Sequence, residues 1–291
     1  MISEFGSVRV PASAANLGPG FDTLAVALPL YLTVSATPAA QFGFRGSGAG
    51  ASETVGEGHL VHRLVLAAAG TDKVSLSIDS EIPLARGLGS SGALAIGVAA
   101  ACGHPDPLAV ALEFEGHPEN VAASYYGGLV AALMDGQQVV VRKIPVDVDL
   151  RFVVVIPEDR LSTKAARRAL PTEVPFGDAV ATISRAVLLS QSFSRLELLA
   201  PVLFEDLIHQ PYRGKIYPLA STLMGVLVDA GCIGACWSGA GSSCLGVAAA
   251  AETAAIRLRV ERSLEARGVK AAVLAMAPDL EGIRRFSGAR P

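Results

Sequence analysis

Residues 83–93 read PLARGLGSSGA, and this stretch decides the fold that we expect of the chain. It follows Val74–Ile78, where apolar and polar residues alternate as in a half-buried β-strand, and it precedes an apolar run with helical character. Gly87, Gly89 and Gly92 allow the backbone to turn with positive φ and to approach a bound group closely. The pattern therefore predicts a strand, a glycine-rich loop and a helix in succession.

The start of a helix after such a loop suits an anion, because its free N–H groups and the positive end of its dipole point the same way. The hydroxyls of Ser90 and Ser91 are expected to cap the helix, and a hydroxyl here could also be a ligand of Mg²⁺. No lysine follows the last glycine, so the loop is not a Walker A motif, and its spacing is not GxGxxG. Taken alone, the loop fits an unliganded turn as well as a phosphate site.

Three further motifs accompany the loop. PASAANLGPGFD (residues 11–22) follows a predicted strand and offers Asn16 and Asp22, either to a small polar substrate or to hydrogen bonds within their own turn. EGHPENVA (residues 115–122) offers Glu115 as a hard oxygen ligand for Mg²⁺ and His117 as a substrate contact or a structural turn residue. WSGAGSSC (residues 237–244) is a second glycine-rich turn.

The composition excludes several classes of protein. Of the 291 residues, 51% are hydrophobic and 18% are charged, so the chain can bury a large core. A net charge of −3 without a long basic run argues against nucleic acid as a partner. No apolar run approaches the roughly 18–20 residues that span a bilayer, and the first residues lack the pattern of a signal peptide, so we expect a cytoplasmic protein without a membrane partner. The four cysteines lack paired spacing and are predicted to be buried free thiols.

The order of predicted elements indicates two mixed α/β halves, residues 1–150 and 151–291. The first half is expected to contain strands at Ser7–Pro11, Leu30–Ala36, Val74–Ile78 and Val139–Ile144, a loop at Phe42–Gly58 and a helix at His59–Ala69. The second is expected to contain strands at Phe152–Ile156 and Lys270–Met276, helices at Asp178–Ser192, Glu197–Leu207 and Thr253–Arg267, and a strand-loop-helix unit at Ile233–Ala250.

Together, PASAANLGPGFD, PLARGLGSSGA and WSGAGSS resemble, in this order, the three signature segments of the GHMP kinases. Within that family, EGHPEN and the segments at residues 162–167 and 209–213 are similar to the homoserine kinases. The resemblance covers roughly residues 8–246. It implies an α/β (α+β) fold of two domains, an N-terminal α/β domain like domain 2 of a small-subunit ribosomal protein and a ferredoxin-like C-terminal domain, with ATP over the glycine-rich loop.

The resemblance also implies a reaction, the transfer of the γ-phosphoryl group of ATP to the side-chain hydroxyl of L-homoserine, with Mg²⁺ as cofactor. The residues implied for the nucleotide are Pro83, Arg86, Gly87, Leu88, Gly89, Ser90, Ser91 and Gly92, and those for Mg²⁺ are Ser91 and Glu115. The residues implied for homoserine are Asn16, Asp22, His117, Arg167, Arg213 and Gly241, and those for catalysis are Asn120 and Arg167. Homodimers occur in the family as well, but no subunit interface can be read from this sequence.

Asn120 stands where several GHMP kinases have a catalytic Asp, and an amide cannot act as a base. We hypothesise that the substrate hydroxyl attacks directly and that Asn120 orients it, because phosphoryl transfer depends mainly on positioning and charge neutralisation. The chain departs from its relatives at Glu119, Gly92 and His59, and at Ser242-Ser243, where Asp, Ala, Asn and Pro-Thr are common. Two alternatives stay open, namely a GHMP kinase for another hydroxylated acceptor such as mevalonate and a non-catalytic metabolite sensor. Asp22, which suits an ammonium group, favours an amino acid.

Overall fold

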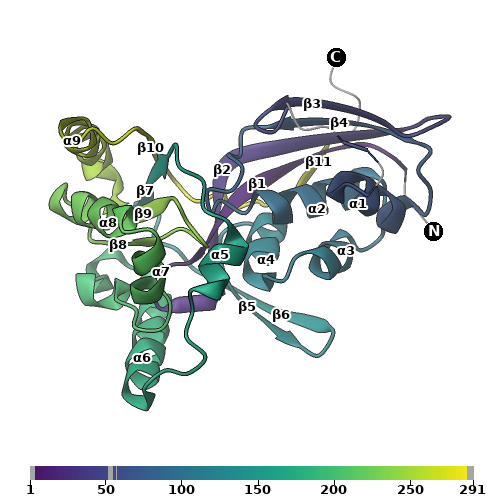
Figure 1. Cartoon of the computed structure of the whole chain (residues 1–291). Helices are drawn as coiled ribbons and strands as arrows, with labels where there is room; N and C mark the ends of the chain where they lie inside the picture. Colours follow the sequence, from purple (N-terminus) through teal and green to yellow (C-terminus); the bar gives the residue numbers. More distant parts are fainter. Residues whose placement is uncertain (1–3, 52–54, 57, 287–291) are drawn as a thin grey trace.

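The computed structural model describes residues 4–51, 55–56 and 58–286. Its strands form two separate sheets, one of seven strands and one of four, which lie in two lobes (Figure 1). The first 144 residues of the chain contribute six strands to the larger sheet, and a short strand near the C-terminus returns to it. The division of the chain at residues 150 and 151 stays a prediction.

The larger sheet has the strand order β11-β1-β2-β4-β3, and β5 and β6 extend from the other part of β2. Its strands are β1 (Ser7–Asn16), β2 (Gly20–Pro38), β3 (Gly43–Gly48), β4 (Val74–Ser80), β5 (Leu129–Asp135), β6 (Gln138–Ile144) and β11 (Arg284–Phe286). All neighbours are antiparallel except β3 and β4. The helices of this lobe, which lie along one side of the sheet in Figure 1, are α1 (Leu60–Ala69), α2 (Ser90–Ala101), α3 (Pro107–Phe114) and α4 (Pro118–Tyr126).

Helix α2 is the centre of this lobe. Its sequence, SSGALAIGVAAA, carries no charged residue, and a helix that is apolar on all sides is expected to be buried. Its small residues allow close contact with the sheet, and a Cβ on Gly97 would lie 2.7 Å from Val34 Cγ2. Helix α2, which follows the glycine-rich loop at residues 83–93, therefore packs closely against β1 and β2.

The smaller sheet is antiparallel with the order β10-β7-β9-β8, formed by β7 (Leu150–Pro157), β8 (Gly234–Trp237), β9 (Cys244–Ala249) and β10 (Ala271–Met276). Its helices are α5 (Thr163–Arg168), α6 (Phe176–Ser192), α7 (Gln210–Ile216), α8 (Leu219–Asp229) and α9 (Thr253–Ala266), with 3-10 turns η1 (Leu196–Leu198), η2 (Pro201–Phe204) and η3 (Ala250–Glu252). Helices separate β7 from β8 and β9 from β10, which is the β-α-β-β-α-β arrangement of ferredoxin-like domains. The two-domain fold expected from the resemblance is confirmed.

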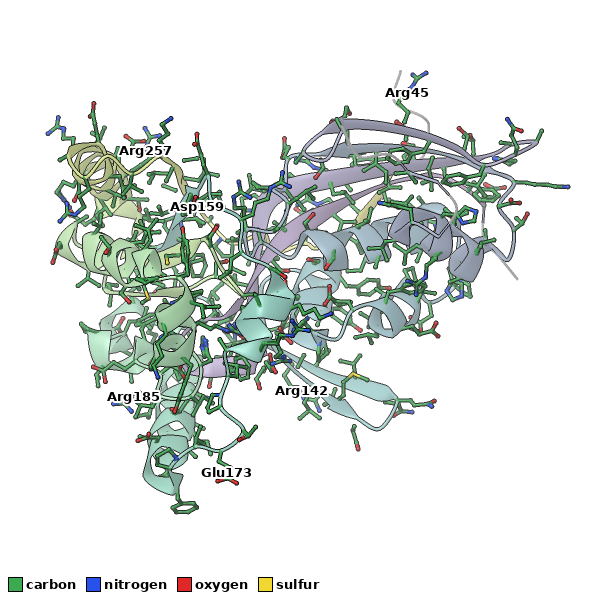
Figure 2. All side chains as sticks on the ribbon, in the orientation of Figure 1. Arg45, Arg142, Asp159, Glu173, Arg185 and Arg257 are labelled. Carbon is green, nitrogen blue, oxygen red and sulfur yellow. The ribbon has the colours of Figure 1, made fainter. Side chains whose placement is uncertain are left out.

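Side chains join the helices of the second lobe to its irregular segments. Arg185, labelled in Figure 2, lies on α6 and donates from Nε to the carbonyl of Val202 at 3.1 Å and from its other end to the carboxylate of Glu205 at 2.8 Å. These bonds hold η2 against α6. The segment that leads from η2 toward α7 is therefore held against α6 at Val202 and Glu205.

Three sequence predictions are wrong. The stretch Phe42–Gly58, expected as a loop, contains β3, because its glycine-rich backbone pairs with β4 over Gly43–Gly48. Glu197–Leu207, expected as one helix, forms two 3-10 turns, because Pro201 cannot continue a helix that begins before it. Ile233–Ala250, expected as strand, loop and helix, is a pair of antiparallel strands, because the Ala-rich part pairs with β7 and β8.

Other predictions are confirmed. The strands expected at Val139–Ile144 and Phe152–Ile156 are present, and the helix at Asp178–Ser192 begins two residues earlier. All four cysteines are free and buried. In the part of the chain that the structure describes, none of the helices is both long and apolar enough to cross a membrane.

Candidate functional site

A cavity of about 330 Å³ lies where the loops after β1, β4 and β8 meet. Its size is at the lower end of the range for small-molecule sites. The predicted site residues that line it are Asn16, Asp22, Pro83, Arg86, Gly87, Leu88, Gly89, Ser90, Ser91, Glu115, His117, Asn120 and Arg213. The structure thus brings together motifs that are up to about two hundred residues apart in the chain. Three described residues, Gly92, Arg167 and Gly241, were predicted for the site but lie outside this lining.

The glycines of the loop at residues 83–93 have conformations that other residues rarely adopt. Gly87 has φ 71° and Gly89 has φ 65°. A Cβ on Gly87 would lie 2.0 Å from the carbonyl oxygen of Ser238, and one on Gly89 would lie 2.0 Å from Ser13 Oγ. Gly92 is different, because a Cβ there would first meet Val121 Cγ2 at 3.5 Å, an ordinary contact that the alanine of its relatives also fits.

Helix α2 begins at Ser90 with Gly89 as its N-cap and no side-chain cap. The prediction that the serines cap it is wrong, because Ser91 Oγ instead donates a hydrogen bond to Glu115 Oε2. The first N–H groups of α2 are therefore not satisfied by a capping side chain, and they border the cavity. Such groups at a helix N-terminus favour a bound phosphate.

Arg86 and Ser238 hold the loop against the second lobe. Arg86 Nε donates to the carbonyl of Pro157 at 2.7 Å, and its terminal nitrogens donate to the carbonyls of Leu84 and Glu158. Ser238 Oγ donates to the carbonyl of Gly87 at 2.7 Å. The guanidinium of Arg86 is thus engaged by backbone carbonyls, and it joins the lobes at the wall of the cavity.

Ser91, Glu115 and His117 form a hydrogen-bonded cluster. His117 Nδ1 lies 2.7 Å from Glu115 Oε1, while Ser91 donates to Oε2. Burial by itself would raise the pKa of Glu115, but the bonds from His117 and Ser91 and the positive charge on His117 more than offset it, and the pKa is lowered. The bond to Glu115 in turn raises the pKa of His117 despite its burial. Glu115 is therefore an anion at neutral pH.

Among residues 4–51, 55–56 and 58–286, no three His, Cys, Asp or Glu side chains lie close enough to hold a metal ion by themselves. Mg²⁺ bound to a nucleotide needs fewer protein ligands, because it takes oxygens from phosphates, water and one or two carboxylates. An anionic carboxylate beside a serine hydroxyl, both facing the start of α2, meets that requirement. The donor set of Ser91 and Glu115 therefore fits Mg²⁺.

Asn120 is fixed between two neighbours. Ser13 Oγ donates to its Oδ1 at 3.0 Å, and its Nδ2 donates to Glu119 Oε1 at 2.9 Å. Glu119 is 1% exposed, and its Oε2 has no partner among the described residues. Burial raises the pKa of Glu119 to about 7. The amide of Asn120 has a defined orientation toward the cavity as a result.

Charged residues line the other end of the cavity. Arg167 donates to Asp22 Oδ2 at 2.6 Å, so Arg167 reaches the site through Asp22. Arg213 is 4% exposed and donates from NH1 to the carbonyl of Gly239 at 2.9 Å, whereas its buried Nε has no partner in the described part of the chain. Burial lowers the pKa of Arg213 to about 10, so the side chain is still a cation at neutral pH.

Asn16 has the structural role that the sequence left open. Its Nδ2 donates to the carbonyl of Gly239 at 2.8 Å, and its Oδ1 accepts from the backbone N–H of Asp22 at 3.1 Å. Asn16 and Asp22 both have positive φ, 75° and 53°. The amide thus shapes the loop that presents Asp22. Gly241 lies behind this wall, and its backbone nitrogen would be 2.7 Å from a Cβ on Gly87.

Sequence reasoning missed several lining residues. They are Ala15, Leu60, Leu84, Ala85, Leu94, Thr163, Gly239 and Ala240, while His59 and Glu119 were noted only as departures from relatives. The carbonyl of Gly239 accepts hydrogen bonds from two buried side chains, those of Asn16 and Arg213. Its position within the motif WSGAGSS is the feature of the sequence that could have pointed to it. Leu60 and Leu94 are apolar, so their residue types alone do not indicate a place in a binding site.

Comparisons with known proteins agree with this geometry. Residues 59–128 match the family description "GHMP kinases N terminal domain", and residues 184–267 match "GHMP kinases C terminal". The chain is 40% identical to a homoserine kinase of Thermus thermophilus over 85% of this chain and 88% of the relative. It is 34% identical to a homoserine kinase of Moorella thermoacetica over 93% and 96% of the two chains.

Solved structures show the same fold. A crystal structure of homoserine kinase from Cytophaga hutchinsonii superposes with a TM-score of 0.81 over 96% of both chains, at 23% identity. A structure of a putative homoserine kinase from Listeria monocytogenes superposes with a TM-score of 0.77 over 97% of this chain and 99% of that one, at 27% identity. With its two matching domains and its curated relatives, the chain belongs to the GHMP kinase family.

Proposed function

We propose that the protein is an ATP-dependent homoserine kinase, which transfers the γ-phosphoryl group of ATP to the side-chain hydroxyl of L-homoserine in threonine biosynthesis. Curated relatives at 34–40% identity bear that name. The product is O-phospho-L-homoserine, and the second product is ADP. The proton of the attacking hydroxyl leaves with the transferred phosphate or to water, because Asn120 cannot accept it.

The observation that carries the proposal is the guanidinium of Arg213, which is buried beside the cavity with Nε unpartnered among the described residues. A buried cation with a free N–H needs an anionic partner, and a carboxylate suits its planar geometry. Asp22 lines the same cavity and suits an ammonium group. The two charges match the two ends of an amino-acid zwitterion.

The other end of the cavity suits ATP. The N–H groups at the start of α2 and the close backbone of Gly87 and Gly89 favour the triphosphate. Ser91 and Glu115 would hold Mg²⁺, which neutralises phosphate charge when it is bound. Asn120 lines the cavity with one Nδ2 hydrogen engaged by Glu119. We propose that its other hydrogen orients the substrate hydroxyl.

The test is an ADP-release assay with Mg·ATP against L-homoserine, D-homoserine, L-threonine, mevalonate and galactose, with a control that lacks an acceptor. Turnover on L-homoserine alone is expected. Turnover on mevalonate would contradict the substrate and preserve the kinase, and bound ATP without turnover on any acceptor would favour the metabolite sensor.

A matched pair of variants sharpens the assay. Arg213→Lys keeps the charge and removes the planar fork, so KM for L-homoserine should rise roughly tenfold or more while KM for ATP stays within about threefold. Arg257→Lys is the control, because it makes the same change on α9, away from the cavity. The side chain of Arg257, labelled in Figure 2, forms an ion pair with Glu261 at 3.6 Å. An equal effect of both substitutions would contradict the assignment of Arg213.

We also propose a cytoplasmic location and a homodimer. The four buried free thiols fit a reducing compartment. Exposed apolar side chains on α6, among them Phe176 and Ile183, fit a contact between subunits. Light scattering during size-exclusion chromatography measures the mass, and a monomer at micromolar concentration would contradict the dimer.

A further inference from the structure

His209 lies immediately before α7 and is fully buried, one helical turn before Arg213. Its Nε2 is 2.8 Å from the carbonyl oxygen of Gly18, and its Nδ1 is 3.3 Å from Arg213 NH1. A carbonyl oxygen only accepts hydrogen bonds and a guanidinium only donates them. Both neighbours therefore require the same form of the ring, neutral with its proton on Nε2.

We propose that His209 is a positioning residue for substrate recognition, which turns the guanidinium of Arg213 so that its Nε edge receives the carboxylate of the acceptor. This inference rests on the proposed function, because it assumes an acceptor with a carboxylate at Arg213.

The contacts of Arg213 NH1 define the orientation. One of its hydrogens is directed to the carbonyl of Gly239 at 2.9 Å, and the other to His209 Nδ1. With both hydrogens engaged by the protein, NH1 does not bind substrate. The Nε–H, which is buried and unpartnered among the described residues, is on the side of the guanidinium that is left for a ligand. The Nε–H and its neighbouring terminal N–H can then hold a carboxylate with two parallel bonds.

The ring of His209 is itself held on several sides. It stacks on Phe21 with a centroid distance of 4.9 Å, and Phe21 also lies beneath the guanidinium of Arg213 at 5.1 Å. The backbone N–H of His209 donates to Asp206 Oδ2 at 2.8 Å. The bond from His209 to Gly18 joins the start of α7 to the loop that presents Asp22. The side chain of His209 therefore connects Asp22, proposed for the ammonium group of the acceptor, with Arg213, proposed for its carboxylate.

The charged groups around His209 are Asp206, with Oδ2 at 3.5 Å from Nε2, Arg213, and Asp22 farther away. Burial, with the charge of Arg213, lowers the pKa of His209 to about 4 in spite of the two carboxylates. The ring is therefore neutral at physiological pH, which leaves Nδ1 free to accept.

Two substitutions separate the two nitrogens of the ring. In His209→Asn, the side-chain oxygen falls near the place of Nδ1 and can still accept from Arg213, whereas the bond to Gly18 is lost. In His209→Gln, the amide nitrogen falls near Nε2 and can still donate to Gly18, whereas the acceptor for Arg213 is lost. Both remove the ring from Phe21, so the two variants differ in which of the two hydrogen bonds of the ring is lost, the one with Gly18 or the one with Arg213.

The expected result is that H209Q raises KM for L-homoserine about tenfold or more, as for the loss of a hydrogen bond to a charged group, while H209N raises it about threefold or less. KM for ATP should change in neither variant. His104→Gln serves as the control, because among the described residues the ring of His104 bonds only to Asp106. In an Arg213→Lys background, H209Q should add less than about twofold, because the two residues act through one contact. Equal effects of H209N and H209Q, or an effect of H209Q that is unchanged in the R213K background, would overturn the inference.

A second measurement does not depend on turnover. Long-range ¹H–¹⁵N correlation spectra of the histidine rings, assigned through the loss of one signal in H209N, should show His209 as the Nε2–H tautomer from pH 5 to pH 8. Titration in that range, or a proton on Nδ1, would overturn the inference whatever the substrate. If the wild-type enzyme does not phosphorylate L-homoserine and the tautomer is as expected, the proposed function fails instead and the contact between His209 and Arg213 stands.

Discussion

Substitution of Gly87 by alanine tests whether the close contact between the two glycine-rich loops is what shapes the nucleotide end of the cavity. Gly87 has φ 71°, and its new Cβ would lie 2.0 Å from the carbonyl oxygen of Ser238 and 2.7 Å from the nitrogen of Gly241. Both neighbours are backbone atoms, so a change of side-chain rotamer cannot relieve the overlap. One of the two loops has to move by about 1 Å to restore an ordinary contact.

The magnitude has two parts. A non-glycine residue in the left-handed region costs about 1–2 kcal/mol. Forcing a methyl group into a packed region costs about 1–3 kcal/mol more. The sum, about 2–5 kcal/mol, can reduce the stability of the fold, or it can displace the loop and weaken ATP binding by a corresponding factor.

The measurements are therefore thermal unfolding without ligand and KM for ATP, taken together. We expect G87A to unfold several degrees lower, to raise KM for ATP more than tenfold, or to do both. Gly70→Ala is the matched control, because Gly70 has nearly the same φ, 66°, but an added Cβ would have no atom of the described residues within 4 Å beyond its own chain neighbours. If G87A loses no more stability than G70A and binds ATP normally, the loops do not constrain each other and the reasoning is refuted.

Three further changes test other parts of the structure. Glu115→Gln removes the anion proposed for Mg²⁺, so kcat should fall and the Mg²⁺ concentration for half-maximal rate should rise roughly tenfold, as a magnesium titration at fixed ATP would show. Glu119→Gln tests a pH dependence. Burial raises the pKa of Glu119 to about 7 from 4.5, so the native state keeps a proton that the unfolded chain releases between these values, and the stability of the wild type falls as the pH rises through that window. The variant does not titrate and should be more stable above pH 7 by at most about 3–4 kcal/mol, since each pH unit between the two pKa values corresponds to about 1.36 kcal/mol, with no difference below pH 4.5 in urea unfolding. Asp279→Ala removes a buried carboxylate that accepts from Tyr31 at 2.8 Å and Arg284 at 3.0 Å, so unfolding should cost about 3–5 kcal/mol less, while an unchanged melting temperature would contradict the role of this ion pair.

The parts of the fold that the sequence predicts are those whose signals are local. The loop at residues 83–93 follows a strand and starts a helix as expected, because its glycines and the apolar run after it determine the local backbone. The stretch Ile233–Ala250 was expected to end in a helix, yet its last part, Cys244–Ala249, forms β9. Its state depends on pairing with β7 and β8, which lie far away in the chain or across a turn, and intrinsic propensity is too weak to decide against such contacts.

In the functional site, too, some features could be predicted from the sequence and others depend on contacts between distant segments. Residues with recognisable chemistry, such as Glu115, Asn120 and Arg213, could be predicted, and the structure places them around one cavity. Most of the contacts that orient them could not, since they join groups from segments that are distant in the chain, such as Asn120 with Ser13 and Arg213 with Gly239. The carbonyl of Gly239 and the ring of His209 have no sequence pattern that identifies their partners, and Ser91 at the start of α2 bonds to Glu115 instead of capping its own helix.

The pairing of β11 with β1 has a consequence for how the chain is made. β1 is synthesised before β2 and β4, which can join it in the sheet early. The strand that pairs with Ser7–Arg9 at its other edge, Arg284–Phe286, is made after all the other strands of the sheet. Until β11 has been made, the outer backbone groups of Ser7–Arg9 are therefore open to another nascent chain, in the manner of any unpaired sheet edge. The yield of native protein should thus depend on how crowded the ribosomes are on its messenger RNA, a property that no measurement on the folded enzyme would reveal.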